Sequence, residues 1–176
     1  MDAKELYLLA VQGNGITEEA FRSFSAHEQG TLEKKWDKYW LKPEARHFKV
    51  VLTGGVFDIL HIGHVLTLQK AKEHGDLLVV IVATDARVQK VKNRKPLHTA
   101  DYRRAMVSSL KPVDLAIVGE EDMMKTFGRV QPDVVAFGYD QTPMKLPAHV
   151  KSVHLTEIKA DERMAKTSEI IRKLGL

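Results

Sequence analysis

The chain has 176 residues, 44% of them apolar, and a formal net charge of +4 at pH 7, a length that predicts one domain with a small extension. It contains no cysteine, which excludes disulfides, thiolate catalysis and cysteine zinc sites, and no apolar run long enough to span a membrane. The charged N-terminus lacks the apolar core of a secretion signal, so we expect a cytoplasmic protein, and the modest positive charge suits a small anionic ligand.

Residues 1–45 are predicted to form a helical extension without strands. Residues 4–11 have a helical pattern, and Thr17 is a suitable N-cap for a second helix that ends near Ser25. Residues 31–41 carry leucine and aromatic side chains at roughly helical spacing, which predicts a third helix. Its aromatic side chains favour a packing or dimer contact: Trp36, Tyr39 and Trp40.

Strand-like and helical segments alternate through residues 46–176. Runs of β-branched side chains, such as residues 78–82, indicate strands that are buried on both faces. We therefore expect an α/β fold with a Rossmann-like parallel five-stranded sheet of order 3-2-1-4-5 and helices on both faces. The expected strands are residues 49–53, 77–83, 115–118, 134–137 and 152–155, and the expected helices are residues 63–74, 85–91, 100–110, 120–129 and 167–174.

The loop between the first strand and the first helix of this region is the most informative segment. It reads Gly-Gly-Val-Phe-Asp-Ile-Leu-His-Ile-Gly-His, residues 54–64, and a strand, a glycine turn and a helix N-terminus together can bind a phosphate chain. His61 and His64 are three residues apart, so they fall on one helix face and can reach one phosphate. The alternatives are two surface histidines or half of a zinc site, although no third ligand is obvious. The loop matches neither the Gly-x-Gly-x-x-Gly pattern of dehydrogenases nor a P-loop.

A basic segment follows the second predicted strand. Residues 90–95 read Lys-Val-Lys-Asn-Arg-Lys, and Arg103 and Arg104 lie on the helix expected after them. These groups could hold a triphosphate, although such a run is more often a solvated loop.

A second glycine-containing loop follows the fourth predicted strand and begins at Gly138. Glycine and aspartate favour turns, so a plain turn is one interpretation. The expected strand order reverses between the first and fourth strands, however, and open α/β sheets bind ligands at that reversal. On this interpretation the two glycine-containing loops face each other across a ligand.

These motifs resemble the nucleotidyltransferase superfamily with a His-x-Gly-His signature, which includes the cytidylyltransferases. The resemblance implies that a phosphate of an acceptor attacks the α-phosphorus of a nucleoside triphosphate, and that pyrophosphate leaves. It implies that His61 and His64 stabilise the phosphoryl oxygens, and that Lys95 and Arg103 hold the β and γ phosphates. Mg²⁺ would enter with the triphosphate, without a metal site of the protein's own. Nucleotide-binding roles are implied for Gly54, Gly55, Val56, Phe57, Asp58, Gly63, Gly138, Tyr139, Asp140, Thr167 and Ser168.

Two of these assignments have a structural alternative. Asp58 could approach the metal ion or stabilise its turn, and Thr167 or Ser168 could be a simple helix N-cap.

Within the superfamily, the longest run of matches is to the archaeal FAD synthases. It covers the histidine loop, Arg-Lys-Pro at residues 94–96, Leu-Lys-Pro-Val-Asp at residues 110–114 and the loop at residues 138–141. This resemblance implies ATP as the donor and FMN as the phosphorylated acceptor. Glycerol-3-phosphate cytidylyltransferase, which would use CTP, is the alternative. Relatives are often dimers, which leaves a homodimer open.

A rival hypothesis from another class is a nucleotide-sensing regulator whose N-terminal helices bind DNA. The basic side chains of residues 1–45 are offset by acidic ones, which is a poor match to a phosphate backbone. No nucleic-acid partner and no membrane partner are therefore expected.

Overall fold

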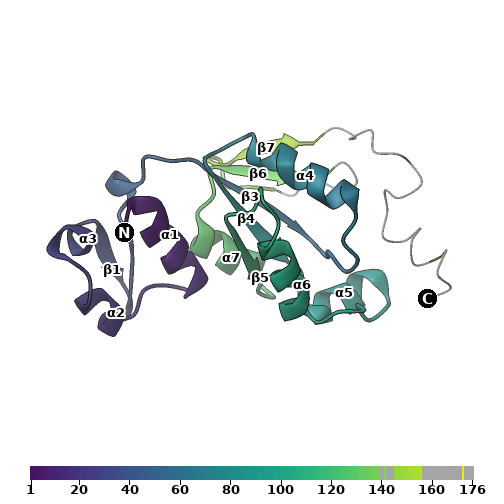
Figure 1. Ribbon diagram of the computed structural model, residues 1–176, viewed down its shortest axis with the longest axis horizontal. Coiled ribbons are helices and arrows are strands. Elements are labelled where there is room, and N and C mark those ends of the chain that lie inside the picture. Colours follow the sequence, from purple (N-terminus) through teal and green to yellow (C-terminus); the bar gives the residue numbers. More distant parts are fainter. Residues whose placement is uncertain (139–140, 142–144, 156–171, 173–176) are drawn as a thin grey trace.

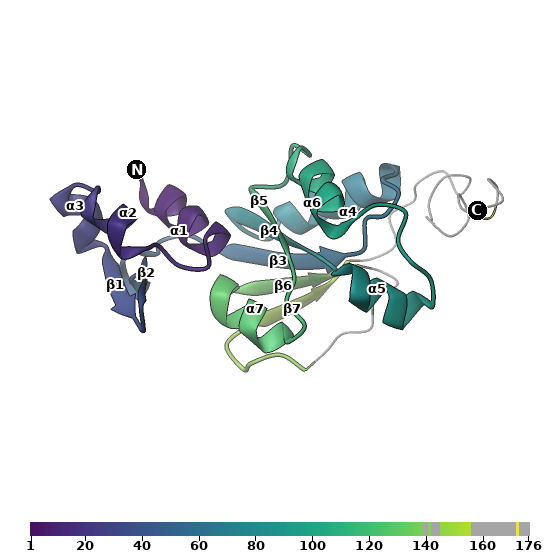
Figure 2. The ribbon, with the colours of Figure 1, turned by 90° about the horizontal axis from the view of Figure 1, so that it is seen from below.

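The computed structural model describes residues 1–138, 141, 145–155 and 172. Five parallel strands form a sheet in the order β5-β4-β3-β6-β7, which confirms the predicted order 3-2-1-4-5. Figures 1 and 2 show helices on both faces of this sheet. The strands are β3 (Val50–Gly55), β4 (Leu77–Val82), β5 (Leu115–Val118), β6 (Val134–Phe137) and β7 (Lys151–His154).

The helices that connect these strands agree with the predicted ones. The helix expected at residues 167–174 lies outside the described residues, apart from residue 172. Side chains alternate between the two faces of a strand. Leu68 and Val107, from two of the helices, therefore share a buried cluster with Val51 on one face of the sheet, whereas Phe127 packs with Leu52 on the other. The helices are α4 (Ile62–Lys72), α5 (Asp85–Lys92), α6 (Ala100–Ser108) and α7 (Met123–Val130).

The N-terminal extension contains three short helices and a two-stranded antiparallel hairpin. The helix at residues 4–11 is confirmed, and the Thr17 hydroxyl caps the next helix by accepting a hydrogen bond from the amide of Ala20. That helix ends at Arg22 rather than near Ser25, and Ser25 instead caps a further short helix that was not predicted. The helix expected over residues 31–41 is wrong, because these residues form the hairpin. The elements are α1 (Ala3–Gln12), α2 (Glu18–Arg22), α3 (Ala26–Gly30), β1 (Leu32–Lys35), β2 (Lys38–Leu41) and the 3₁₀ helix η1 (Pro43–Ala45).

Contacts between residues distant in the sequence explain the hairpin. Tyr39 stacks on Phe21 of α2 with ring centroids 3.8 Å apart, and Leu32 pairs with Leu41, both of them buried. Trp36 occupies the turn with a φ of 56°, and its side chain is 91% exposed. A helix over these residues would satisfy the local spacing, but it could not pair Leu32 with Leu41.

The extension shares its core with the sheet. Leu6, Tyr7 and Val11 of α1 belong to the same buried cluster as Leu52 of β3 and Val130 of α7. The Tyr7 hydroxyl also donates a hydrogen bond to the carbonyl oxygen of Val130 at 2.6 Å. The domain boundary expected between residues 45 and 46 stays a prediction, but the two parts are in close contact.

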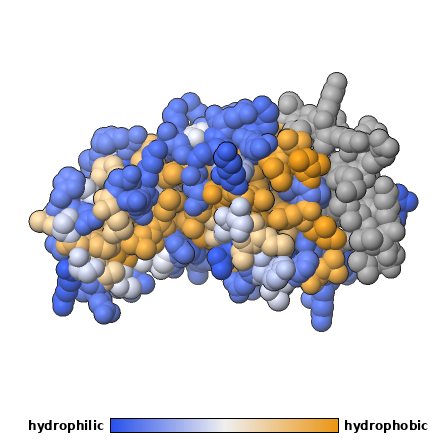
Figure 3. Space-filling model, in the orientation of Figure 1, coloured by the Kyte–Doolittle hydropathy of each residue, from blue (hydrophilic) through white to orange (hydrophobic). Residues whose placement is uncertain are grey.

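Some large apolar side chains are exposed at the surface. On the face shown in Figure 3, hydrophilic residues cover the upper edge and apolar residues gather across the middle. No helix in the described part of the chain is both long and apolar enough to cross a bilayer. Single exposed apolar side chains are normal at a protein surface; here they include Trp36, Ile62, Val91, Tyr102 and Met124.

Candidate active site

A cavity of about 770 Å³ opens at the carboxyl ends of the parallel strands. Its walls come from the loops after β3, β4, β5 and β6 and from the helices α4, α5 and α7. The strand order reverses between β3 and β6, which is where open α/β sheets bind their ligands. The Gln141 side chain joins the loops that follow these two strands, since it accepts from the amide of Gly138 at 2.9 Å and donates to the carbonyl oxygen of Gly54 at 2.8 Å. The expectation that these loops face each other is confirmed.

The loop after β3 is tight because of its two glycines. A Cβ atom on Gly54 would lie 3.3 Å from the carbonyl oxygen of Ile81, and one on Gly55 would lie 2.9 Å from the Phe57 ring. Phe57 itself has a φ of 54°, in the left-handed region. The two glycines therefore allow the Ile81 carbonyl and the Phe57 ring to pack closely against this loop. The predicted residues of the loop all line the cavity, while their contact with a nucleotide stays a prediction: Gly54, Gly55, Val56, Phe57, Asp58 and Gly63.

His61 and His64 lie side by side at the N-terminus of α4. His61 is the N-cap residue and His64 belongs to the first turn, and their rings stack with centroids 3.9 Å apart. Both line the cavity. The Nδ1 atom of each ring is buried without a hydrogen-bond partner among the described residues. Because unpaired buried polar atoms are costly, such a pair is suited to receive a ligand.

Burial lowers the pKa of both imidazoles. The pKa of His64 falls to about 4, because burial and then the neighbouring His61 disfavour its charged form. Burial also lowers the pKa of His61. Each ring is therefore mainly neutral near pH 7 and has one N–H donor. The N-terminus of α4 adds partial positive charge at the same point, so the site attracts anions without carrying two imidazolium ions.

Three basic side chains line the cavity within the described residues: Arg87, Lys92 and Arg94. Lys95 was predicted to hold phosphate, but it lines a separate, smaller cavity of about 370 Å³ together with Asp85. The structure therefore does not bring Lys95 to the histidines. Lys92 and Arg94 belong to the basic run recognised in the sequence. Arg87 was not among the predicted residues. It follows the carboxyl end of β4, and open α/β sheets bind their ligands beyond the carboxyl ends of the strands.

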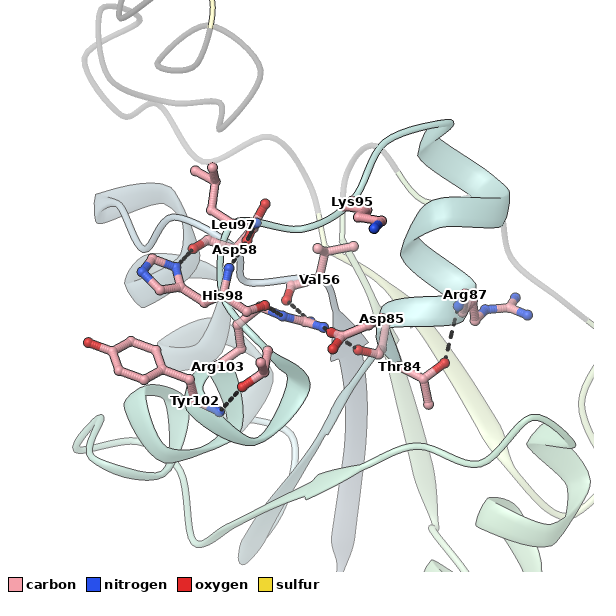
Figure 4. A network of polar contacts seen from close by, with 12 residues as sticks. Val56, Asp58, Thr84, Asp85, Arg87, Lys95, Leu97, His98, Tyr102 and Arg103 are labelled. Atoms are coloured by element: carbon pink, nitrogen blue, oxygen red, sulfur yellow. Dashed lines mark hydrogen bonds and ion pairs between the residues drawn. The ribbon is translucent and has the colours of Figure 1, made fainter. Parts of the chain in front are cut away.

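Arg103 does not reach the cavity, contrary to its predicted contact with phosphate. Its side chain is 0% exposed, and Figure 4 shows its guanidinium among backbone carbonyl groups. It donates to the carbonyl oxygens of Val56 at 2.6 Å, Ala83 at 2.8 Å and His98 at 3.0 Å, and it pairs with Asp85 at 2.5 Å. With these donors occupied, the role that fits Arg103 is to fix the loops after β3 and β4.

Asp58 anchors the basic loop above the site. Its carboxylate is 1% exposed and accepts hydrogen bonds from Nη1 of Arg94 at 2.8 Å and from the amides of Leu97 at 2.8 Å and His98 at 3.2 Å. Burial acts to raise the pKa of this carboxyl, but the hydrogen bonds from Arg94, His98 and Leu97 outweigh it and lower the pKa. Both carboxylate oxygens are occupied, which favours the turn-stabilising role over contact with a metal ion.

The other predicted site residues follow β6 or lie near the C-terminus. Gly138 lines the cavity. Thr84 and Thr126 also line it, and nothing in the sequence singled them out. Across the described ranges, no group of three His, Asp or Glu side chains is arranged to hold a metal ion. The following predictions lie outside the described residues: Tyr139, Asp140, Thr167 and Ser168.

Comparison with known sequences gives a family match and several related proteins. Residues 52–173 match the family model for cytidylyltransferase-like proteins. A protein named FAD synthase from Aciduliprofundum boonei is 54% identical over 92 residues, and one from Thermoplasma acidophilum is 49% identical over 92 residues. Each match covers 52% of this chain but only 61% and 64% of those relatives, respectively. A FAD synthase from Thermococcus sibiricus is 39% identical over 134 residues, which cover 70% of this chain and 90% of that protein.

A solved structure is also similar. It is described as a lipopolysaccharide core biosynthesis protein from Thermoplasma volcanium, with 38% sequence identity and a TM-score of 0.58. The match covers 64% of this chain and 99% of that one. The fold that surrounds the cavity is therefore shared, whereas the family match begins after the N-terminal extension.

Proposed function

Because the chain belongs to the cytidylyltransferase-like family, we propose that it is a nucleotidyltransferase that joins the AMP part of ATP to FMN, giving FAD and pyrophosphate. The observation that carries the proposal is the pair His61 and His64, stacked at the N-terminus of α4 and open to the cavity. Three related proteins are named FAD synthase, and one of them matches over 90% of its length, which supports FMN and ATP as substrates.

The reaction needs positioning and charge stabilisation rather than a covalent intermediate. A phosphate oxygen of FMN attacks the α-phosphorus of ATP, and pyrophosphate leaves from the opposite side. The attacking group is already a competent nucleophile, so the protein has to align it and stabilise the charge that grows on the phosphoryl oxygens. The N–H groups of His61 and His64 donate to these oxygens, and the N-terminus of α4 adds its partial positive charge.

The basic wall of the cavity suits the leaving group. Arg87, Lys92 and Arg94 lie on the segment after β4, and all three line the same cavity as the histidines. We assign them to the β and γ phosphates. Asp58 and Arg103 act indirectly, because they hold the loops on which this wall depends.

The wall formed by α7 suits the flavin. Met123 and Phe127 line the cavity from this helix, and Phe57 lines it from the loop after β3. An isoalloxazine ring is large and planar and needs an apolar slot with a few polar groups, which is how small-molecule sites are usually built. Glycerol-3-phosphate is small and polar and has no ring that could pack against these apolar side chains.

Magnesium remains part of the proposal as an ion that enters with ATP. Mg²⁺ keeps much of its water and often binds through substrate phosphates. Across the described residues no cluster of three suitable ligands exists, and the oxygens of Asp58 already accept hydrogen bonds. In the proposed complex the ligands of the ion would therefore be phosphate oxygens and water.

The first prediction concerns the substrates. Incubation of the protein with Mg²⁺, FMN and ATP should yield FAD and an equal amount of pyrophosphate, measured by chromatography and by a coupled phosphate assay. CTP with FMN and CTP with glycerol-3-phosphate serve as comparisons. Formation of CDP-glycerol without any flavin product would contradict the choice of acceptor. Binding of a nucleotide without release of pyrophosphate would favour a nucleotide-sensing regulator, although residues 1–45 contain six Lys and Arg against eight Asp and Glu.

The second prediction concerns the basic loop. Replacing Lys92 with alanine should weaken the binding of a non-hydrolysable ATP analogue about tenfold, because a charge-assisted contact contributes about 1.5 kcal/mol. Lys95→Ala is a matched control, since both lysines are exposed but only Lys92 lines the cavity. Titration calorimetry measures both. If Lys95→Ala weakens binding and Lys92→Ala does not, the triphosphate lies on the other side of the loop, as expected from the sequence.

A further inference from the structure

The helix α7 contacts both the cavity and the N-terminal extension. Met123 and Phe127 line the cavity. At the last residue of α7, the carbonyl oxygen of Val130 accepts a hydrogen bond from the Tyr7 hydroxyl of α1 at 2.6 Å. Figure 1 shows α7 next to α1, where the extension meets the sheet. This single short helix therefore connects the extension to the wall assigned to the flavin.

Arg129 of α7 makes the connection through the end of α1. Its Nε atom donates to the carbonyl oxygen of Val11 at 2.6 Å, and its Nη2 atom donates to that of Gln12 at 2.9 Å. The last carbonyl groups of a helix have no partner within the helix, and a cation at this end is also favoured by the helix dipole. The Arg129 side chain is only 14% exposed, and its hydrogen bond to Val11 is partly buried.

The same guanidinium faces the loop after β5. Its Nη1 atom lies 4.0 Å from Oε1 of Glu120, and Glu120 lines the cavity. The amide of Glu120 donates to the hydroxyl of Thr126 at 3.3 Å, which ties this loop to α7. Arg129 thus contacts α1 on one side and approaches a cavity-lining residue on the other.

We propose that Arg129 is a positioning residue that holds the α7 wall of the cavity against the end of α1, so that the N-terminal extension sets the affinity for the acceptor. The proposal rests on the proposed function, in which Met123 and Phe127 contact the flavin ring. Arg129 touches no substrate. Arg129 acts by fixing the helix that carries these two side chains. Without its guanidinium, α7 loses the hydrogen bonds to the carbonyl groups at the end of α1.

Replacing Arg129 with alanine in the full chain should raise KM for FMN about tenfold, the size of effect expected from a small displacement of a binding wall. The KM for ATP should change less than about twofold, because the basic wall belongs to the segment after β4. Arg129→Lys keeps a donor near the α1 carbonyl groups and should recover part of the affinity. Steady-state kinetics with each substrate varied in turn measures these values.

Arg46 offers a matched control for a purely structural role. It donates to the carbonyl oxygen of Gln131 at 2.7 Å and pairs with Asp133 at 2.5 Å, just after α7, and it does not line the cavity. Arg46→Ala should lower the melting temperature to a similar degree as Arg129→Ala, yet leave KM for FMN unchanged. Equal increases of KM in the two variants, or an unchanged KM in Arg129→Ala, would overturn the proposal.

Hydrogen exchange tests the inference without any assumption about the substrate. In Arg129→Ala the amides of residues 119–127 should exchange faster relative to those of β3 and β4, because local opening follows the loss of local contacts. Arg46→Ala should not have this effect. Unchanged protection of residues 119–127 would refute the role of Arg129, whereas a wild-type protein that makes no FAD would refute only the proposed function.

Discussion

Replacing His61 or His64 with alanine should lower kcat for FAD formation about 100- to 1000-fold, which is the usual loss when one preorganised donor to a developing charge is removed. The two rings stack 3.9 Å apart on α4 and line the cavity, and their Nδ1 atoms find no partner among the described residues. We therefore expect each ring to contribute to ligand binding more than to the fold. Steady-state rates at saturating ATP and FMN measure the loss, and circular dichroism checks that the fold is intact.

His74→Ala is the appropriate control, because His74 is an exposed histidine just beyond the opposite end of α4. Its replacement should leave kcat within a factor of about two, as expected for a surface position away from the site. A near-normal kcat in His61→Ala or His64→Ala would remove that histidine from the reaction. A large loss in His74→Ala would mean that damage to α4, rather than loss of a donor, explains the effect.

The sheet and the histidine loop could be predicted from the sequence because both are encoded locally. A run such as residues 78–82 is β-branched and apolar throughout, since β4 is buried on both faces, and few other structures suit such a run. The strand order followed from the alternation of strands and helices together with the family resemblance. The histidines are three residues apart at a predicted helix start, and in the structure the N-cap His61 lies beside His64 of the first turn.

The hairpin in the extension could not be predicted by the same means. Its apolar side chains have a spacing that fits a helix, and the deciding contacts come from elsewhere in the chain. Tyr39 stacks on Phe21, and the Tyr39 backbone also bridges to Ile16. A bulky residue such as Trp36 at positive φ is uncommon. The turn contains no glycine or asparagine, the residues that usually indicate a tight hairpin turn in a sequence.

The basic residues show a second limit of sequence-based prediction. The run at residues 90–95 was recognised, but which of its side chains face the cavity depends on how the loop is held. Asp58 determines this, because its carboxylate binds Arg94 and the amides of Leu97 and His98. For Arg103 the sequence does contain an indication of burial. The apolar Val107 lies four residues later, so the two side chains share one helix face, and both are buried in the structure.

The strand and helix pattern of the sheet is complete without the N-terminal extension, and the sequence alone therefore predicts that the extension is dispensable for folding. The packing indicates the opposite. Side chains of the sheet and of α7 bury three residues of α1: Leu6, Tyr7 and Val11. Burial of each such side chain contributes about 1.5–3 kcal/mol to the free energy of unfolding. Their sum is comparable to the typical stability of a domain, about 5–15 kcal/mol.

Deleting residues 1–45 should therefore abolish the cooperative unfolding transition of the remaining chain, measured by circular dichroism during urea titration. In the full chain, Tyr7→Ala should lower the free energy of unfolding by about 3–5 kcal/mol, because it removes a buried aromatic ring and its hydrogen bond to Val130. Trp36→Ala is the control, since a side chain that is 91% exposed should change stability by less than about 0.5 kcal/mol. A truncated chain that unfolds cooperatively at the full-length midpoint would mean that the sheet forms its core alone. The boundary predicted between residues 45 and 46 would then separate two independent units, and the contact between Tyr7 and α7 would contribute nothing to the fold.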